Sequence, residues 1–154
     1  MKHRGWIAFS GLIWLAAGIS LMHKGLKFVA DARYFPDAFC VRFQERFGSV
    51  QAAGTALIAV ALLIGFIKGR FVLVKTVRRV SFRIQSLPLP IKITSLYTPS
   101  YLILLGSMMG LGFLIRFIPM PTDIRGFIDV AIGSALINGA ILYFRAARGS
   151  LRVN

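Results

Sequence analysis

The chain has 154 residues, of which 56% are hydrophobic and only 16% charged, and its formal net charge is +14. So little polar material cannot cover the surface of an ordinary water-soluble domain, and we therefore expect a membrane protein. The basic balance does not indicate nucleic-acid binding, because the positive-inside rule for membrane proteins accounts for it.

Four apolar segments, each about as long as a bilayer is thick, follow one another along the chain. They cover residues 5–22, 50–67, 101–118 and 126–144. At ~1.5 Å per residue each segment forms a helix about 27–29 Å long, close to the ~30 Å hydrocarbon core of a bilayer. The sequence therefore predicts an all-α integral membrane protein, a single domain over 1–154 with four transmembrane helices.

The first segment follows the basic start MKHR, which is also typical of a secretory signal peptide. A cleaved signal peptide needs small residues at its cleavage site, and WLAAGISLMHKG matches that pattern poorly. We therefore expect an uncleaved transmembrane helix here.

The first loop, 23–49, is predicted to contain a short amphipathic helix. Phe39, Phe43 and Phe47 repeat every four residues, and Pro36 precedes them. Such a helix either tethers the loop at the membrane interface or forms a lid or partner surface. Cys40, in the same loop, is the only cysteine, so an internal disulfide is excluded and only an intermolecular one stays open.

The second loop, 68–100, begins with the basic stretch KGRFVLVKTVRRVSFRIQS. On a helical wheel its aliphatic side chains fall on one face and its basic side chains on the other, which predicts an amphipathic helix on an anionic leaflet. One interpretation is topological anchoring; the other is recognition of a lipid headgroup or an acidic partner. The candidate binding residues are Lys75, Arg78, Arg79 and Arg83.

The charges also predict the topology. If the N-terminus lies inside, the inner segments hold twelve Lys and Arg and no acidic residue, whereas the outer segments hold seven basic and all five acidic residues. The positive-inside rule then predicts a bacterial cytoplasmic (inner) membrane protein with both termini in the cytoplasm.

Two apolar stretches resemble each other: GTALIAVALL at 54–63 and GSALINGAIL at 133–142. A true duplication would make each unit a helical hairpin. Two helices return the chain to its starting side, so the hairpins would be parallel and related by an axis along the membrane normal.

Two charged residues fall inside the last two apolar segments. Arg116 lies near the outer end of the third and Asp129 near the outer end of the fourth, and the short connection between them predicts an antiparallel pair with both charges at similar depth. Charges inside a membrane are costly, so we expect the two to pair. The pair is either a structural clasp or an ion or proton site.

Asn138 lies near mid-membrane and shares its helix face with Ala131, Ser134 and Ala135. Small residues allow close helix contact, and an amide can hydrogen-bond across it, or it can line a polar pathway. Asp129 points the opposite way, so this helix has two faces unsuited to lipid. Four helices alone could hardly bury both, which predicts a homo-oligomer.

No catalytic grouping, metal-ligand pattern or phosphate-binding loop is present in the sequence, so neither an enzyme nor a cofactor is expected. Two functional classes follow. The first is an oligomeric channel or transporter for a small solute or ion that uses Arg116, Asp129 and Asn138. The alternative is a non-transporting scaffold, assembly factor or accessory subunit that binds anionic phospholipid or an acidic partner.

Overall fold

The computed structural model describes residues 3–86, 110, 114 and 117–149. Within these residues it contains helices and no strand, which confirms the all-helical prediction. The elements are α1 (His3–Asp31), the 3-10 helix η1 (Ala32–Tyr34), α2 (Phe39–Arg42), α3 (Gln44–Phe47), α4 (Val50–Ser86) and α7 (Thr122–Ala147).

Three of these helices, α1, α4 and α7, are long and apolar enough to cross a membrane. They contain 29, 37 and 26 residues, so each extends beyond the apolar segment predicted within it. Most of the remaining predicted span, 101–118, lies outside the described residues, so a fourth crossing stays a prediction.

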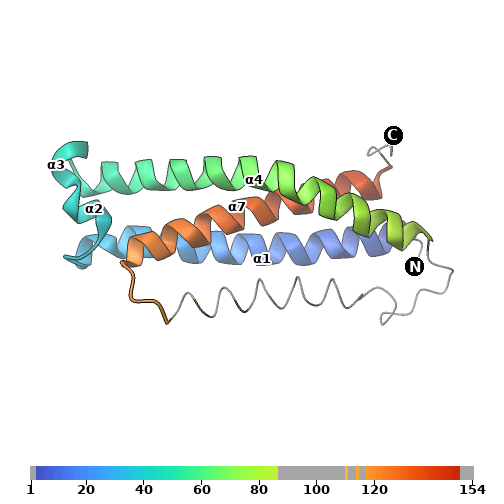
Figure 1. Ribbon diagram of the computed structural model, residues 1–154, viewed down its shortest axis with the longest axis horizontal. Coiled ribbons are helices and arrows are strands. Elements are labelled where there is room, and N and C mark those ends of the chain that lie inside the picture. Colours follow the sequence, from blue (N-terminus) through green and yellow to red (C-terminus); the bar gives the residue numbers. More distant parts are fainter. Residues whose placement is uncertain (1–2, 87–109, 111–113, 115–116, 150–154) are drawn as a thin grey trace.

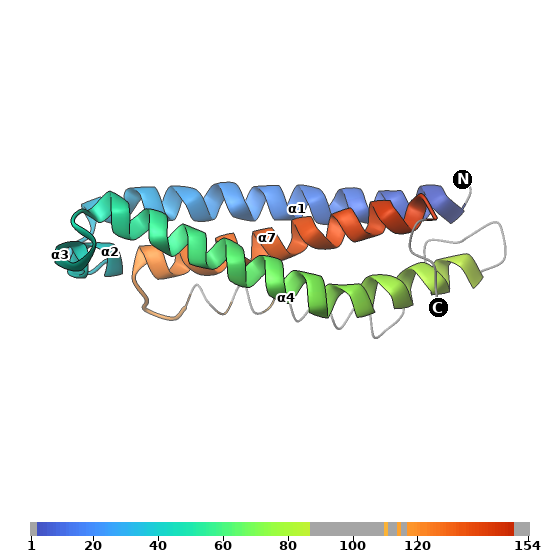
Figure 2. The ribbon, with the colours of Figure 1, turned by 90° about the horizontal axis from the view of Figure 1, so that it is seen from above.

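Helix α7 lies between α1 and α4, as both views of the bundle show (Figures 1 and 2). It is antiparallel to α1 and parallel to α4. Helices α1 and α4, which would form the first of the two predicted hairpins, contact each other far less than either contacts α7. The structure therefore does not confirm two repeated hairpins.

The α1–α7 contact is built from small residues that repeat every seven positions. Gly11, Gly18 and Gly25 of α1 face Ala140, Gly133 and Gly126 of α7, respectively. A Cβ atom placed on Gly25 would lie 2.7 Å from the carbonyl oxygen of Gly126, and one on Gly18 would lie 3.0 Å from that of Gly133. The two backbones therefore touch directly, as small residues allow in membrane helix pairs.

A second contact of this kind joins α4 to α7. Gly65 and Gly69 of α4 lie against Ala131 and Ala135 of α7, again with no room for a larger side chain. The four-residue spacing on both helices brings small residues together on successive turns. Helix α7 thus presents one small-residue face to α1 and another to α4.

The predicted basic surface helix is the last part of α4, not a separate element. Its aliphatic face does not lie on a membrane surface, because Val77 is 0% exposed and belongs to a buried cluster with Ile7, Trp14 and Tyr143. The prediction of an amphipathic pattern was therefore correct, but its apolar side packs on α1 and α7. The reason is that the helix continues without a break through the loop predicted at residue 68.

The connection between α1 and α4 is shorter than the predicted 23–49, because α1 continues to Asp31. Its predicted amphipathic helix is broken at Phe43 (φ −103°, ψ 11°) into the one-turn helices α2 and α3. The rings of Phe39 and Phe43 still stack, 4.3 Å apart.

Candidate functional site

The most deeply buried charged residue among the described residues is Asp123, in the first turn of α7, which is 0% exposed. Its Oδ2 accepts a 2.7 Å hydrogen bond from the backbone N–H of Cys40, and its Oδ1 accepts one of 2.9 Å from the N–H of Ile124. A buried carboxylate needs such donors, and a helix N-terminus supplies favourable partial charge as well. Asp123 therefore joins α2, in the connection between α1 and α4, to α7.

The Cys40 thiol is buried beside this carboxylate. Burial, first of all, and then the hydrogen bond to Asp123 and the negative charge of Asp123 together raise its pKa from 9.0 to about 12. The thiolate is the reactive form of cysteine, so this side chain is inert at neutral pH. Its burial also prevents the intermolecular disulfide that the sequence left open. Sequence analysis placed Asp123 among the exposed outer acids and missed this pair.

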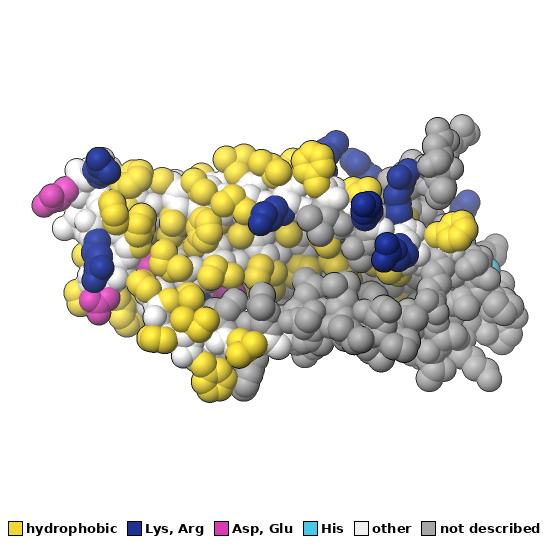
Figure 3. Space-filling view, in the orientation of Figure 1, with side chains coloured by type: hydrophobic (Ala, Val, Ile, Leu, Met, Phe, Trp, Pro, Cys, Tyr) yellow, Lys and Arg dark blue, Asp and Glu magenta, His cyan; other side chains and the backbone are white. Residues whose placement is uncertain are grey.

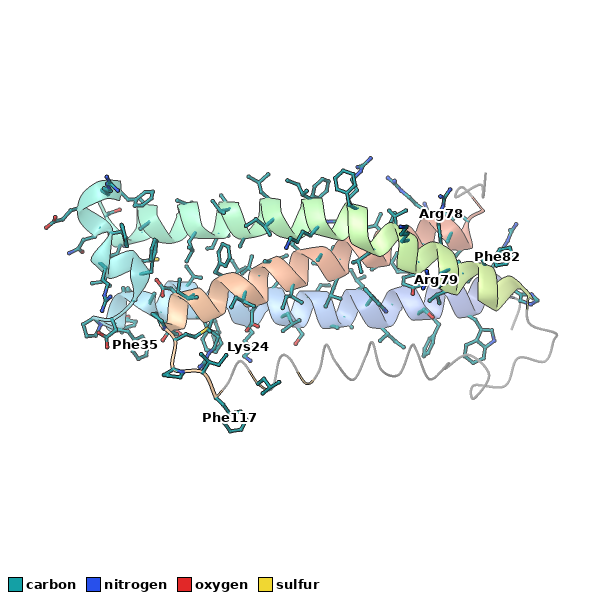
Figure 4. The ribbon with its side chains drawn as sticks, in the orientation of Figure 1. Lys24, Phe35, Arg78, Arg79, Phe82 and Phe117 are labelled. Atoms are coloured by element: carbon teal, nitrogen blue, oxygen red, sulfur yellow. The ribbon has the colours of Figure 1, made fainter. Side chains whose placement is uncertain are left out.

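Asp129 pairs across the α1–α7 contact with Lys24 of α1, at an N···O distance of 3.9 Å. Lys24 also lies 5.4 Å from the ring centroid of Phe28. Figure 4 shows Lys24 at the end of the bundle where α7 begins. Arg116, the predicted partner, lies outside the described residues, so its pairing with Asp129 stays a prediction. Sequence analysis missed Lys24 because it assigned that residue to a loop.

The interhelical hydrogen bond expected of Asn138 is made by its neighbour. Asn138 donates through Nδ2 to the carbonyl oxygen of Ser134, within α7, over 3.2 Å. The Ser134 hydroxyl instead donates to the carbonyl oxygen of Leu62 in α4, over 3.3 Å.

The two faces of α7 that predicted an oligomer are both covered within one chain. The face with Ala131, Ser134 and Ala135 packs on α4, and the face with Gly133 and Ala140 packs on α1. The sequence argument for a homo-oligomer therefore loses its basis.

Basic side chains gather at the end of the bundle where α1 begins and α4 ends, and acidic side chains are visible only at the opposite end in the view of Figure 3. Lys75, Arg78 and Arg79 of α4 are exposed there, and Figure 4 shows Arg78 and Arg79 near Phe82. The side chain of Arg83 lies outside the described part. Three of the four predicted lipid-binding residues thus lie exposed at one end of the bundle.

Among the residues that the structure describes, no three His, Cys, Asp or Glu side chains come close enough together to hold a metal ion. Comparison of the chain with known protein families, with curated proteins and with solved structures finds no match. The candidate site is therefore assigned from its own geometry, and the features available for function are the basic end of α4 and the Lys24–Asp129 pair.

Proposed function

We propose that the protein is a non-transporting accessory or scaffold protein of the bacterial inner membrane, and that its cytoplasmic end binds anionic phospholipid headgroups. The observation that supports this proposal is the difference in exposure between the two sides of the last part of α4. Its apolar side is occupied by the protein core at Val77, while Lys75, Arg78 and Arg79 remain exposed. The apolar side holds this part of α4 against the protein core, and the basic side chains face outward, where a ligand can reach them.

A phosphate-bearing headgroup fits these residues in charge and in position. Each Lys or Arg near an anionic leaflet contributes ~1 kcal/mol, so the loss of two charges should weaken binding by about 30-fold. Arg is also suited to phosphate because its guanidinium group donates two parallel hydrogen bonds. Arg4, whose guanidinium lies 3.9 Å from a Cβ placed on Gly149, adds another basic group at the same end.

The test uses the two tryptophans of the chain, Trp6 and Trp14, which both lie toward this end of α1. In nanodiscs, brominated phosphatidylglycerol should quench their fluorescence at a much lower mole fraction than brominated phosphatidylcholine. The double variant Arg78→Gln/Arg79→Gln should raise that mole fraction by about 30-fold. The control Arg33→Gln/Arg42→Gln, at the opposite end, should leave it unchanged. Equal quenching by both lipids in the wild type would disprove the proposal.

The channel or transporter predicted from the sequence is the second candidate, and the Lys24–Asp129 ion pair is the observation that favours it. An ion pair at the outer end of two membrane helices is suited to an entrance for a small ion. In vesicles, Asp129→Asn should then abolish flux while the protein stays folded. An unchanged ion permeability between empty vesicles and vesicles that contain the protein would eliminate this candidate.

A further inference from the structure

The exposed hydrophobic side chains form a belt around the bundle. On α1 the belt extends from Phe9 to Leu26, and on α4 it begins at Val60 and continues to Phe71. Phe9 and Leu26 are seventeen residues apart, which corresponds to about 26 Å along a helix. This height matches the hydrocarbon core of a bilayer, so the belt marks the depth at which lipid tails contact the protein.

Lys68 of α4 lies level with the middle of the α1 part of this belt. Gly18, midway between Phe9 and Leu26, contacts Gly133 of α7. On the other side of α7, Ala131 and Ala135, which bracket Gly133, contact Gly65 and Gly69, which bracket Lys68. Lys68 is nevertheless exposed. Figure 3 shows basic side chains within the hydrophobic surface as well as at the end of the bundle. A lysine at mid-membrane depth is costly unless an anionic group meets it.

No acidic side chain of this chain can meet Lys68. The sequence has five acidic residues, and none lies between residues 46 and 122, so neither α4 nor the apolar segment 101–118 contains one. Of the five, Asp123 is bonded to Cys40 and Asp129 to Lys24. The other three lie at or beyond the outer end of α1: Asp31, Asp37 and Glu45.

A second copy cannot supply the missing carboxylate either. If the second copy had the same orientation in the membrane as the first, its acidic residues would lie toward the outer end of the bundle, as they do in the first copy, and not at the depth of Lys68. The inverted orientation is opposed by the strong bias of basic residues to one side. The anionic group must therefore come from a different molecule.

The surface around Lys68 has the form of a helix-binding seam. Ile64, Lys68, Phe71 and Lys75 follow the alternating four- and three-residue spacing that keeps one face of a helix toward a partner helix. All four are exposed, with Phe71 at 75%. Arg70, which is also exposed and lies at nearly the same depth, points about 200° away from Lys68, so it lies on a different side of α4.

We infer that this seam, defined by Ile64, Lys68, Phe71 and Lys75, binds a transmembrane helix of a different protein that carries a carboxylate at mid-membrane depth, opposite Lys68. The inference rests on the proposed accessory role and names the class of its partner. The ammonium of Lys68 and the carboxylate neutralise each other in the apolar belt, and Ile64 and Phe71 pack on the partner helix. The ion pair sets the depth and the register of the complex.

The probe is a synthetic polyleucine transmembrane helix with one central glutamate, and its reference is the same helix with a central leucine. A central glutamate lies at the same depth whichever way the peptide inserts. Binding is measured in phosphatidylcholine vesicles by energy transfer from the full-length protein, labelled at its N-terminus, to the peptide. We expect the glutamate peptide to bind at least about tenfold more tightly, which corresponds to ~1.4 kcal/mol.

Two matched variants decide the result. Lys68→Leu should abolish the preference for glutamate, whereas Arg70→Leu, which removes a charge at the same depth from another side of α4, should preserve it. No preference in the wild type, or a preference that survives Lys68→Leu, would overturn the inference. So would a preference that disappears when phosphatidylglycerol is added, because a lipid phosphate would then be the ligand of Lys68.

The same variants separate this inference from the proposed function. Lys68→Leu should retain the quenching by brominated phosphatidylglycerol, and Arg78→Gln/Arg79→Gln should retain the preference for the glutamate peptide. Loss of both properties in either variant would mean that one basic surface serves both roles and that the seam is not a separate site.

Discussion

Replacing Gly25 by Ala tests whether the α1–α7 backbones are in direct contact. The added Cβ would lie 2.7 Å from the carbonyl oxygen of Gly126 and 2.8 Å from both the backbone nitrogen and a methyl group of Val130. Close carbon–oxygen contacts between helices settle at about 3.3–3.6 Å, so the helices must separate locally by about 0.6–0.9 Å. A gap of that size forfeits about a quarter to a half of each dispersion contact across it.

The expected cost follows from two opposing terms. Overpacking of this kind destabilises by about 1–3 kcal/mol. Alanine in place of a mid-helix glycine recovers about 0.5–1 kcal/mol. The free energy of unfolding should therefore fall by about 0–2.5 kcal/mol, with a central value of about 1.3 kcal/mol, in Gly25→Ala. Gly54→Ala is the matched control, because its Cβ would meet a side-chain methyl of Val29 at 3.3 Å, and that methyl can move. This control should be neutral or slightly stabilising.

The assay is unfolding by SDS in mixed micelles, followed by tryptophan fluorescence. Trp14 reports on the contact, because it is buried and its ring lies 5.7 Å from that of Tyr143 in α7. If Gly25→Ala and Gly54→Ala show the same midpoint, the two backbones do not touch, and the depth assigned to Lys68 through Gly18 and Gly133 fails with them.

Four further predictions concern the polar contacts. Because burial and Asp123 raise the pKa of Cys40 to about 12, maleimide should label the folded protein slowly at pH 7.5 and the unfolded protein fast; fast labelling of both would contradict the burial. The same shift means that the folded state keeps a proton that the unfolded state loses, so the free energy of unfolding should be unaffected by this group below pH 9.0 and should fall from there toward pH 12. Asp123→Asn leaves one acceptor oxygen for the two N–H groups of Cys40 and Ile124, so the amide NH2 must oppose one of them, and the change should cost about 1–3 kcal/mol in an SDS titration, whereas the exposed Asp37→Asn should cost less than about 0.5 kcal/mol. Ser134→Ala should cost about 0.6 kcal/mol, as is typical of a hydrogen bond between membrane helices, and Asn138→Ala less; the reverse order would show that the amide, not the hydroxyl, joins the helices.

Much of the architecture follows from local patterns in the sequence. Long apolar runs fix helices α1, α4 and α7, because only a helix satisfies the backbone of such a run within a bilayer. The aliphatic spacing that includes Val77 correctly predicts which side of the last part of α4 is buried. It does not reveal what covers that side, because a protein core and a membrane surface select the same residue types.

The polar contacts are less accessible from the sequence, because they join distant positions. Cys40 and Asp123 are 83 residues apart, and nothing near either residue signals the other. Lys24 was assigned to a loop because the apolar run of α1 ends before it, although the helix itself continues to Asp31. The depth of Lys68 depends on the register of α4 against α7, which is set by which glycines meet which alanines. A single helix does not contain that information.

The two faces of α4 account for how the molecule can be both rigid and available to a partner. Gly65 and Gly69 fix α4 to α7 at the depth of Lys68, so a partner on the opposite seam meets a helix that cannot shift its register. A rigid seam loses little conformational entropy when it binds, and the cost of association is correspondingly smaller. Enlarging Gly65 should therefore weaken the discrimination between the glutamate and leucine peptides even though Gly65 lies on the side of α4 that faces α7. The glycine contacts between α1 and α7 fix the position of α7 along α1, and the contacts of Gly65 and Gly69 fix α4 along α7. Together these contacts set the depth of Lys68.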